Sequence, residues 1–150
     1  MNKYIYIIGV LMFSACHPKP KTETASAVKT AAVANPAPVI KEVTITPGAN
    51  MSDIGNTYQL MGMEIKDDVL TLNVEYSGGC KEHTWELISN GSYAKSLPPQ
   101  ITVCLKHNNH EDACRRLTMG PISFNISKLK HAGNNELIIK CGEQQASYKY

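Results

Sequence analysis

The amino-acid sequence predicts an all-β fold: a single antiparallel β-sandwich, or a small barrel, of about eight short strands. Two observations carry this prediction. After residue 38, apolar and polar residues alternate with a period of two in several runs, and clusters of Gly, Pro, Asn and Asp separate these runs. Helix is limited to a single turn, expected at 127–130.

The clearest strand signal lies at 69–76, where Leu70, Leu72 and Val74 alternate with polar residues. A strand at 39–46 is expected to end before Pro47, and the pair Asn90-Gly91 is expected to form a turn. The predicted strands are 39–46, 58–65, 69–76, 83–88, 100–106, 122–126, 137–141 and 147–150.

Length and composition allow one domain and a tail. The chain has 150 residues, of which 43% are apolar and 19% charged, so a packed core is expected. The formal net charge is only +2, and no concentrated basic face of the kind that nucleic acid requires is visible. No apolar run reaches the length of about 18 residues that a membrane-spanning helix needs.

The first 16 residues have the features of an export signal. Lys3 gives a positive start, residues 4–13 are apolar, and the small residues Ser14 and Ala15 precede Cys16. The segment 13–16 resembles the lipobox of bacterial lipoproteins, with Phe13 in place of the commoner Leu. The resemblance implies a lipoprotein signal peptide at 1–15 and a Cys16 that carries acyl chains such as palmitate, which hold the protein on a membrane. His17 stands where many proteins retained at the inner membrane have Asp, and analogy with that sorting rule favours the outer membrane, in either leaflet.

Residues 16–37 are expected to form a lipidated flexible linker. They are rich in Ala, Thr, Pro and Lys and contain no aromatic residue, so they cannot bury enough surface to offset the entropy of ordering. The folded domain is therefore predicted to occupy residues 38–150.

Four cysteines remain once Cys16 is assigned to lipid. An even number in an exported chain favours disulfides, because the compartment is oxidising. Three connectivities are open, and we favour Cys80–Cys114 together with Cys104–Cys141. The first pair is the better supported, because both of its cysteines fall in loops beside histidines.

A metal site is the alternative interpretation of the same loops. They contain C-x-x-H at 80–83 and H-x-x-H-x-x-x-C at 107–114, and thiolates and imidazoles at such spacings suit tetrahedral zinc, or copper. Against this, His83 shares a strand face with Trp85 and is expected to be a core or rim residue bonded to backbone. The candidate ligands are Cys80, His83, His107, His110 and Cys114.

No catalytic residues are predicted. The sequence contains no nucleophile elbow, metalloprotease motif, phosphate-binding loop or dinucleotide fingerprint, so we expect no enzyme and no cofactor unless zinc or copper binds. Arg115 and Arg116 form a basic pair that could recognise carboxylates of a partner.

Two segments, 77–87 with G-G-C-x-x-H and 107–127 with D-x-C-R, resemble a group of small bacterial envelope lipoproteins. The resemblance implies fold and location and brings no activity with it. The leading hypothesis is a membrane-anchored, non-enzymatic accessory or binding module, with a metal-binding envelope protein and an inhibitor of a foreign hydrolase as alternatives.

Overall fold

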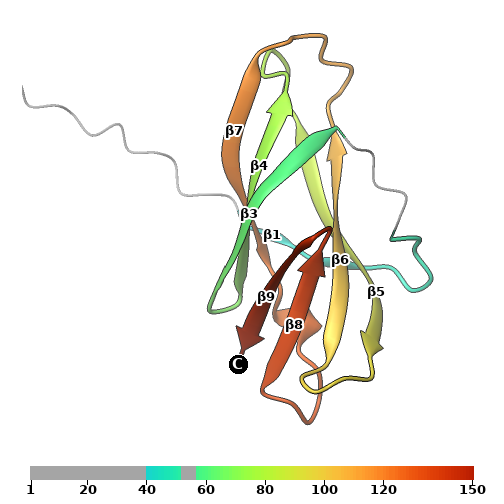
Figure 1. Ribbon diagram of the computed structural model, residues 1–150. Helices are drawn as coiled ribbons and strands as arrows, with labels where there is room; N and C mark the ends of the chain where they lie inside the picture. Colours follow the sequence, from blue (N-terminus) through green and yellow to red (C-terminus); the bar gives the residue numbers. More distant parts are fainter. Residues whose placement is uncertain (1–39, 52–56) are drawn as a thin grey trace, which may run out of the picture. The chain divides into compact units, whose positions relative to one another are not determined.

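The computed structural model describes residues 40–51 and 57–150 and folds them into a β-sandwich of two sheets (Figure 1). The predicted signal peptide, Cys16 and the linker at 16–37 lie outside the described residues and remain predictions. No helix in the described ranges is long and apolar enough to cross a membrane.

One sheet has the strand order β1-β7-β4-β3 and the other has the order β2-β5-β6-β8-β9. Neighbouring strands are antiparallel in most pairs, but β1–β7, β2–β5 and β6–β8 are parallel, which the antiparallel prediction did not include. The strands are β1 (Lys41–Glu42), β2 (Thr44–Ile45), β3 (Tyr58–Lys66), β4 (Val69–Ser77), β5 (Thr84–Ala94), β6 (Gln100–Asn108), β7 (Leu117–Asn125), β8 (Glu136–Cys141) and β9 (Gln144–Lys149).

The core lies between the sheets and is built from the alternating residues that predicted the strands. Leu70, Leu72 and Val74 of β4 are almost fully buried, and the next residue after each faces the other side of the sheet. The matching residues of the opposite sheet include Leu87, Val103, Leu105, Leu137 and Ile139. The predicted sandwich is therefore confirmed.

The single strand predicted at 39–46 is two short strands in two different sheets. Val43 separates them and turns its side chain into the core, where it is 2% exposed. Its N–H donates to the Asn125 carbonyl in one sheet, whereas the N–H of Thr46 donates to Ser89 in the other. The chain thus crosses from one sheet to the other at Val43.

The predicted turn at Asn90-Gly91 is wrong, because β5 continues through it. The strand absorbs extra residues as a bulge, with a register shift between Ser89 and Tyr93 relative to β6. Gly91 has a φ of +72°, which a bulge tolerates best in glycine. The single helical turn is confirmed as a 3-10 helix at Ser127–Leu129.

Candidate functional site

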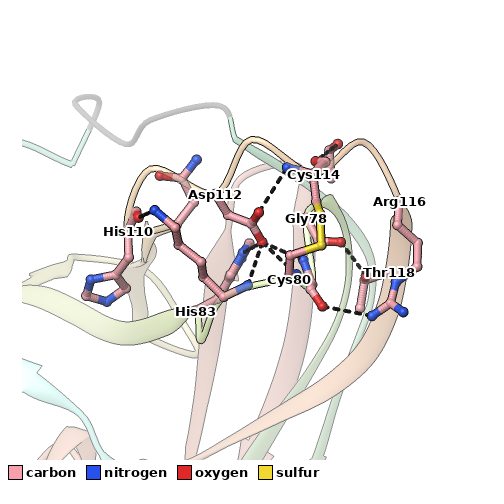
Figure 2. Close-up of polar contacts among 12 residues, drawn as sticks. Gly78, Cys80, His83, His110, Asp112, Cys114, Arg116 and Thr118 are labelled. Carbon is pink, nitrogen blue, oxygen red and sulfur yellow. Dashed lines mark hydrogen bonds and ion pairs between the residues drawn. A yellow bond between two sulfur atoms is a disulfide. The ribbon is translucent and has the colours of Figure 1, made fainter.

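Two loops that connect the sheets meet at one end of the sandwich, which we call the disulfide end. Loop 78–83 joins β4 to β5, and loop 109–116 joins β6 to β7. Since β4 and β7 are antiparallel neighbours with Ser77 opposite Leu117, the positions three residues beyond this pair, Cys80 and Cys114, also face each other. Their Cα atoms are 6.0 Å apart, and the predicted bridge between them is present (Figure 2).

Asp112 is the hydrogen-bonding hub of the disulfide end (Figure 2). Its Oδ2 atom accepts hydrogen bonds from three consecutive backbone amides, those of Gly79, Cys80 and Lys81, at 2.8, 2.9 and 3.0 Å. Its Oδ1 atom accepts from the Cys114 amide at 2.9 Å. Backbone hydrogen bonds to the carboxylate hold the pKa of Asp112 far below its usual range, and the hydrogen bond from the Cys114 amide has the largest effect.

The two glycines before Cys80 make this arrangement sterically accessible. Gly78 and Gly79 have φ values of +142° and +96°, a region that other residues rarely adopt. A Cβ atom on Gly78 would collide with the His83 ring, and one on Gly79 would lie 2.7 Å from the Arg116 guanidinium. The G-G-C segment is thus required for the loop to wrap around the carboxylate.

A chain of side-chain hydrogen bonds leads from buried Asp112 to exposed Thr57. His83 Nε2 lies 3.1 Å from Asp112 Oδ2, His83 Nδ1 lies 2.8 Å from His107 Nε2, and His107 Nδ1 lies 2.7 Å from Thr57 Oγ1. With both imidazoles neutral, one set of tautomers satisfies every atom, with each N–H pointing toward Asp112 and the Thr57 hydroxyl donating to His107. Burial, and to a smaller extent His83, lowers the pKa of His107 to about 4, consistent with a neutral ring.

The tip of loop 109–116 is held in an unusual backbone conformation. His110 and Glu111 both have left-handed φ values, +48° and +56°. Their amides donate to the side-chain oxygens of Asn108 and Asn109, while Lys81 Nζ donates to the carbonyls of His110 and Glu111 at 2.9 and 3.0 Å. Contacts from both loops therefore fix the tip.

Several charged side chains of this end point outward. Glu82, Glu111 and Arg115 are exposed, and within the described residues their side chains make no hydrogen bond or ion pair. Arg116 differs from its neighbour, because its Nη2 donates to the Gly79 carbonyl at 3.0 Å. The predicted basic pair thus separates into one residue that holds the loop and one that is free to meet a partner.

The second predicted disulfide, Cys104–Cys141, is wrong: both are free, buried thiols. Cys104 shares its strand parity with the exposed Thr102 and lies on the outer face of the sheet, where its thiol donates to the Met51 carbonyl. Cys141 follows Leu137 and Ile139 and faces the core. The two side chains leave opposite faces of the same sheet and cannot meet.

The predicted metal ligands are not gathered around one point. Cys80 and Cys114 are bonded to each other, and His83 and His107 are occupied by each other and by Asp112 or Thr57. The Nε2 atom of His110 points elsewhere, to the Thr84 hydroxyl at 3.2 Å. Ligand atoms of Cys80, Asp112 and Cys114 lie within 4.8 Å of one another, but the disulfide consumes both thiolates, so zinc or copper there requires reduced protein.

The sequence analysis did not predict that two residues take part in this hydrogen-bond network. Asp112 entered only as the Asp of the D-x-C-R segment, and Thr57 did not enter. A double glycine before a cysteine can leave several consecutive backbone N–H groups without partners in a strand. This sequence pattern could have predicted a nearby hydrogen-bond acceptor such as Asp112. His83 is buried as expected, but its partners are side chains rather than backbone.

Comparison with known proteins identifies the fold. A family model for the NigD-like C-terminal beta sandwich domain matches residues 42–149. The chain belongs to this family. The match spans nearly all of the described NigD-like domain, from β1 to the end of β9.

The chain is also similar to several solved structures, of which the first, with a TM-score above 0.5, shares the fold. A NigD-like immunity protein from Bacteroides caccae is 14% identical with a TM-score of 0.52, over 73% of this chain and 59% of that one. A protein of unknown function from Bacteroides vulgatus is 18% identical with a TM-score of 0.49, over 74% of this chain and 56% of that one. A protein from Parabacteroides distasonis described as toxin-related is 26% identical with a TM-score of 0.47, over 74% of this chain and 60% of that one.

The matched region covers less than two thirds of each of these solved proteins. No curated protein matches the chain.

Proposed function

We propose that this protein is a membrane-anchored envelope lipoprotein whose NigD-like domain binds a protein partner, without catalysis, at the disulfide end. One observation carries the proposal. The backbone of both loops is fixed by the disulfide, Asp112 and Lys81, while Glu82, Glu111 and Arg115 are exposed and unpaired within the described residues.

A rigid loop that presents free charged side chains suits recognition. Binding costs less entropy when the backbone is already ordered, so only the side chains must be immobilised. The left-handed conformations of His110 and Glu111 support this assignment, because backbone strain persists where the surrounding structure enforces it, often at ligand-binding sites. Exposed charges of both signs favour a protein surface as the partner.

The polar network beneath the loops supports binding rather than acid–base chemistry. The side chains of His83 and Asp112 are each 2% exposed. Both His83 nitrogens and both Asp112 oxygens already have protein partners. A general acid or base must reach its substrate, directly or through one water, and these groups face inward.

The family suggests which partner to test first. One solved NigD-like protein is described as an immunity protein. A protein toxin that reaches the cell envelope is therefore the first class to examine, and a foreign hydrolase is one form that such a toxin could take.

Mutants at the disulfide end test the proposal. Envelope proteins would be captured with the wild-type chain and with three variants, Arg115→Glu, Glu111→Lys and Lys95→Glu. The last is a matched charge change, because Lys95 is exposed in the loop 95–99 at the opposite end of the sandwich. We expect a partner that the wild type and Lys95→Glu retain equally and that the other two variants lose by about tenfold or more. Equal capture by all four would show that binding does not use this end.

The anchor is tested separately. Cys16→Ser removes the thiol that lipid requires, so the variant should leave the membrane fraction for the soluble fraction. If it still sediments with membranes while it remains folded, the lipid anchor is absent and only that part of the proposal fails.

A further inference from the structure

Potential metal ligands lie together at the disulfide end. Cys80, Asp112 and Cys114 each offer one ligand atom, and these three atoms lie within 4.8 Å of one another (Figure 2). Zinc accepts thiolate and carboxylate ligands in a tetrahedral site, but a sulfur in a disulfide is not a thiolate. The number of ligands that this cluster can offer is therefore set by the redox state of one bond.

We propose that reduction of the Cys80–Cys114 bridge creates a zinc site whose protein ligands are the two thiolates and the Asp112 carboxylate. A dithiol reductant supplies the two electrons and two protons that convert the bridge into two thiols, and is itself oxidised to a disulfide. Zinc then displaces the two thiol protons, which are released as the Zn–S bonds form. Water fills the fourth position. A metal ion thus closes the same ring that the disulfide closes in the oxidised protein.

The backbone holds the two cysteines at a separation that suits a metal ion. The Cα atoms of Cys80 and Cys114 are 6.0 Å apart, and the pairing of β4 with β7 up to Ser77 and Leu117 brings them together independently of the bridge. With Zn–S bonds of about 2.3 Å, two thiolates on a tetrahedral ion lie about 3.8 Å apart. Rotation of the two side chains therefore brings both sulfurs to the metal while the backbone keeps its place.

Asp112 has one oxygen with unused acceptor capacity. Its Oδ2 atom accepts from the amides of residues 79–81 and lies 3.1 Å from His83 Nε2. Within the described residues its Oδ1 atom accepts only from the Cys114 amide, at 2.9 Å. A carboxylate oxygen has two lone pairs, so Oδ1 keeps one for a metal. The contacts to Oδ2 then become the hydrogen bonds that orient a ligating carboxylate.

The bridge is accessible in the folded domain. Cys80 is exposed and Cys114 is half-buried, so a reductant and then a metal ion can reach the sulfurs while the sheets stay paired. The ion and its three anionic ligands carry one net negative charge. Lys81 and Arg116, which hold the same two loops, place positive charge nearby.

Metal binding to the full-length Cys16→Ser chain tests the site. Protein is reduced with a dithiol, freed of it without air, and titrated with Zn²⁺ against a chelator; Co²⁺ serves as a second probe, because its absorption reports thiolate ligands. We expect one ion per monomer, bound about 100-fold or more tightly by reduced than by oxidised protein. Cys80→Ser/Cys114→Ser, which keeps the buried thiols of β6 and β8, should bind no better than the oxidised chain. Equal binding by oxidised protein, or one ion shared by two chains, would overturn the proposal.

Two identical substitutions at different places test the carboxylate. Asp112→Asn removes the proposed ligand, whereas Asp67→Asn removes the same charge from an exposed residue of the β3–β4 turn. In reduced protein we expect Asp112→Asn to weaken Zn²⁺ binding by about tenfold or more, and Asp67→Asn to change it by less than about twofold. The cobalt–thiolate absorption should persist in Asp112→Asn, which would show that the two cysteines still converge. Equal Zn²⁺ affinities in the two variants would exclude Asp112 and overturn the three-ligand site.

Discussion

The imidazole of His107 stacks on the indole of Trp85, with ring centroids 3.8 Å apart and planes within 7° of each other. The two residues are direct neighbours across β5 and β6. The stack covers one face of the imidazole, and hydrogen bonds occupy both of its nitrogens, so a protonated ring would be poorly solvated. This environment is consistent with a lowered pKa of His107, which keeps the ring uncharged at neutral pH.

The stability of the domain should therefore decrease in mild acid. His107 has a folded pKa of about 4 against an ordinary 6.5, so the unfolded chain takes up the proton first as the pH falls. Its contribution is complete above pH 6.5 and is lost progressively toward pH 4. Urea denaturation of Cys16→Ser at several pH values measures this, and His107→Phe, which keeps a ring beside Trp85, should flatten the dependence. A free energy of unfolding that is unchanged between pH 7 and pH 4 would contradict the assignment.

Asp112→Asn should loosen the disulfide end. The amide nitrogen of Asn donates rather than accepts, so the variant cannot satisfy all the backbone N–H groups that now meet the two carboxylate oxygens. We expect a lower Tm and faster exchange of the Gly79, Cys80 and Lys81 amides. Asp67→Asn is the control, since Asp67 is exposed in the β3–β4 turn with φ of +52°, which Asn tolerates. If both variants melt alike, Asp112 does not organise the loop.

Removing the disulfide should cost a substantial part of the stability. Cys80 and Cys114 are 34 residues apart, and the chain-entropy model assigns about 3–4 kcal/mol to a loop of that size. Cys80→Ser/Cys114→Ser should lower the free energy of unfolding in urea by about this amount. A loss below about 1 kcal/mol would show that the loop is held chiefly by Asp112 and Lys81.

The two free thiols should be unreactive in the folded protein. Burial raises the pKa of Cys104, and burial together with Cys104 raises that of Cys141 to about 11, so little thiolate forms at pH 8. Titration of Cys16→Ser with a disulfide reagent should detect both thiols only after denaturant is added. Rapid native reaction, or no thiol at all in the denatured chain, would contradict the structure.

Much of the fold follows from strand periodicity, because every second residue is buried in β8 and from Leu70 to Val74 in β4. The failures occur where the backbone departs from a regular strand. Asn90-Gly91 carries the composition of a tight turn, but tertiary pairing with β6 converts it into a bulge. Val43 lies within the single strand predicted at 39–46, but in the structure the chain passes from one sheet to the other at this residue.

The candidate site shows the same division. The Cys80–Cys114 bridge could be predicted because each cysteine lies in a loop beside a histidine. The strand faces of Cys104 and Cys141 can be read from the sequence, and they argue against a bridge between the two. Cys104 lies on the same strand face as polar Thr102, whereas Cys141 lies on the same face as apolar Ile139. The Asp112 network could not be derived, because it depends on two loops from different strand pairs that meet only in the folded chain.

The Cys80–Cys114 bridge encloses the whole β5–β6 hairpin in a covalent ring, while β4 and β7 enter and leave at the closure point. Strands β4 and β7 are far apart in sequence, so in a reduced chain their pairing requires the closure of a long loop, which costs entropy and slows folding. In the oxidised chain the first partners, Ser77 and Leu117, are already tethered side by side. Refolding of the oxidised protein should therefore be faster than that of the reduced protein, so that a bond which stabilises the loops also shortens the route by which the two sheets assemble.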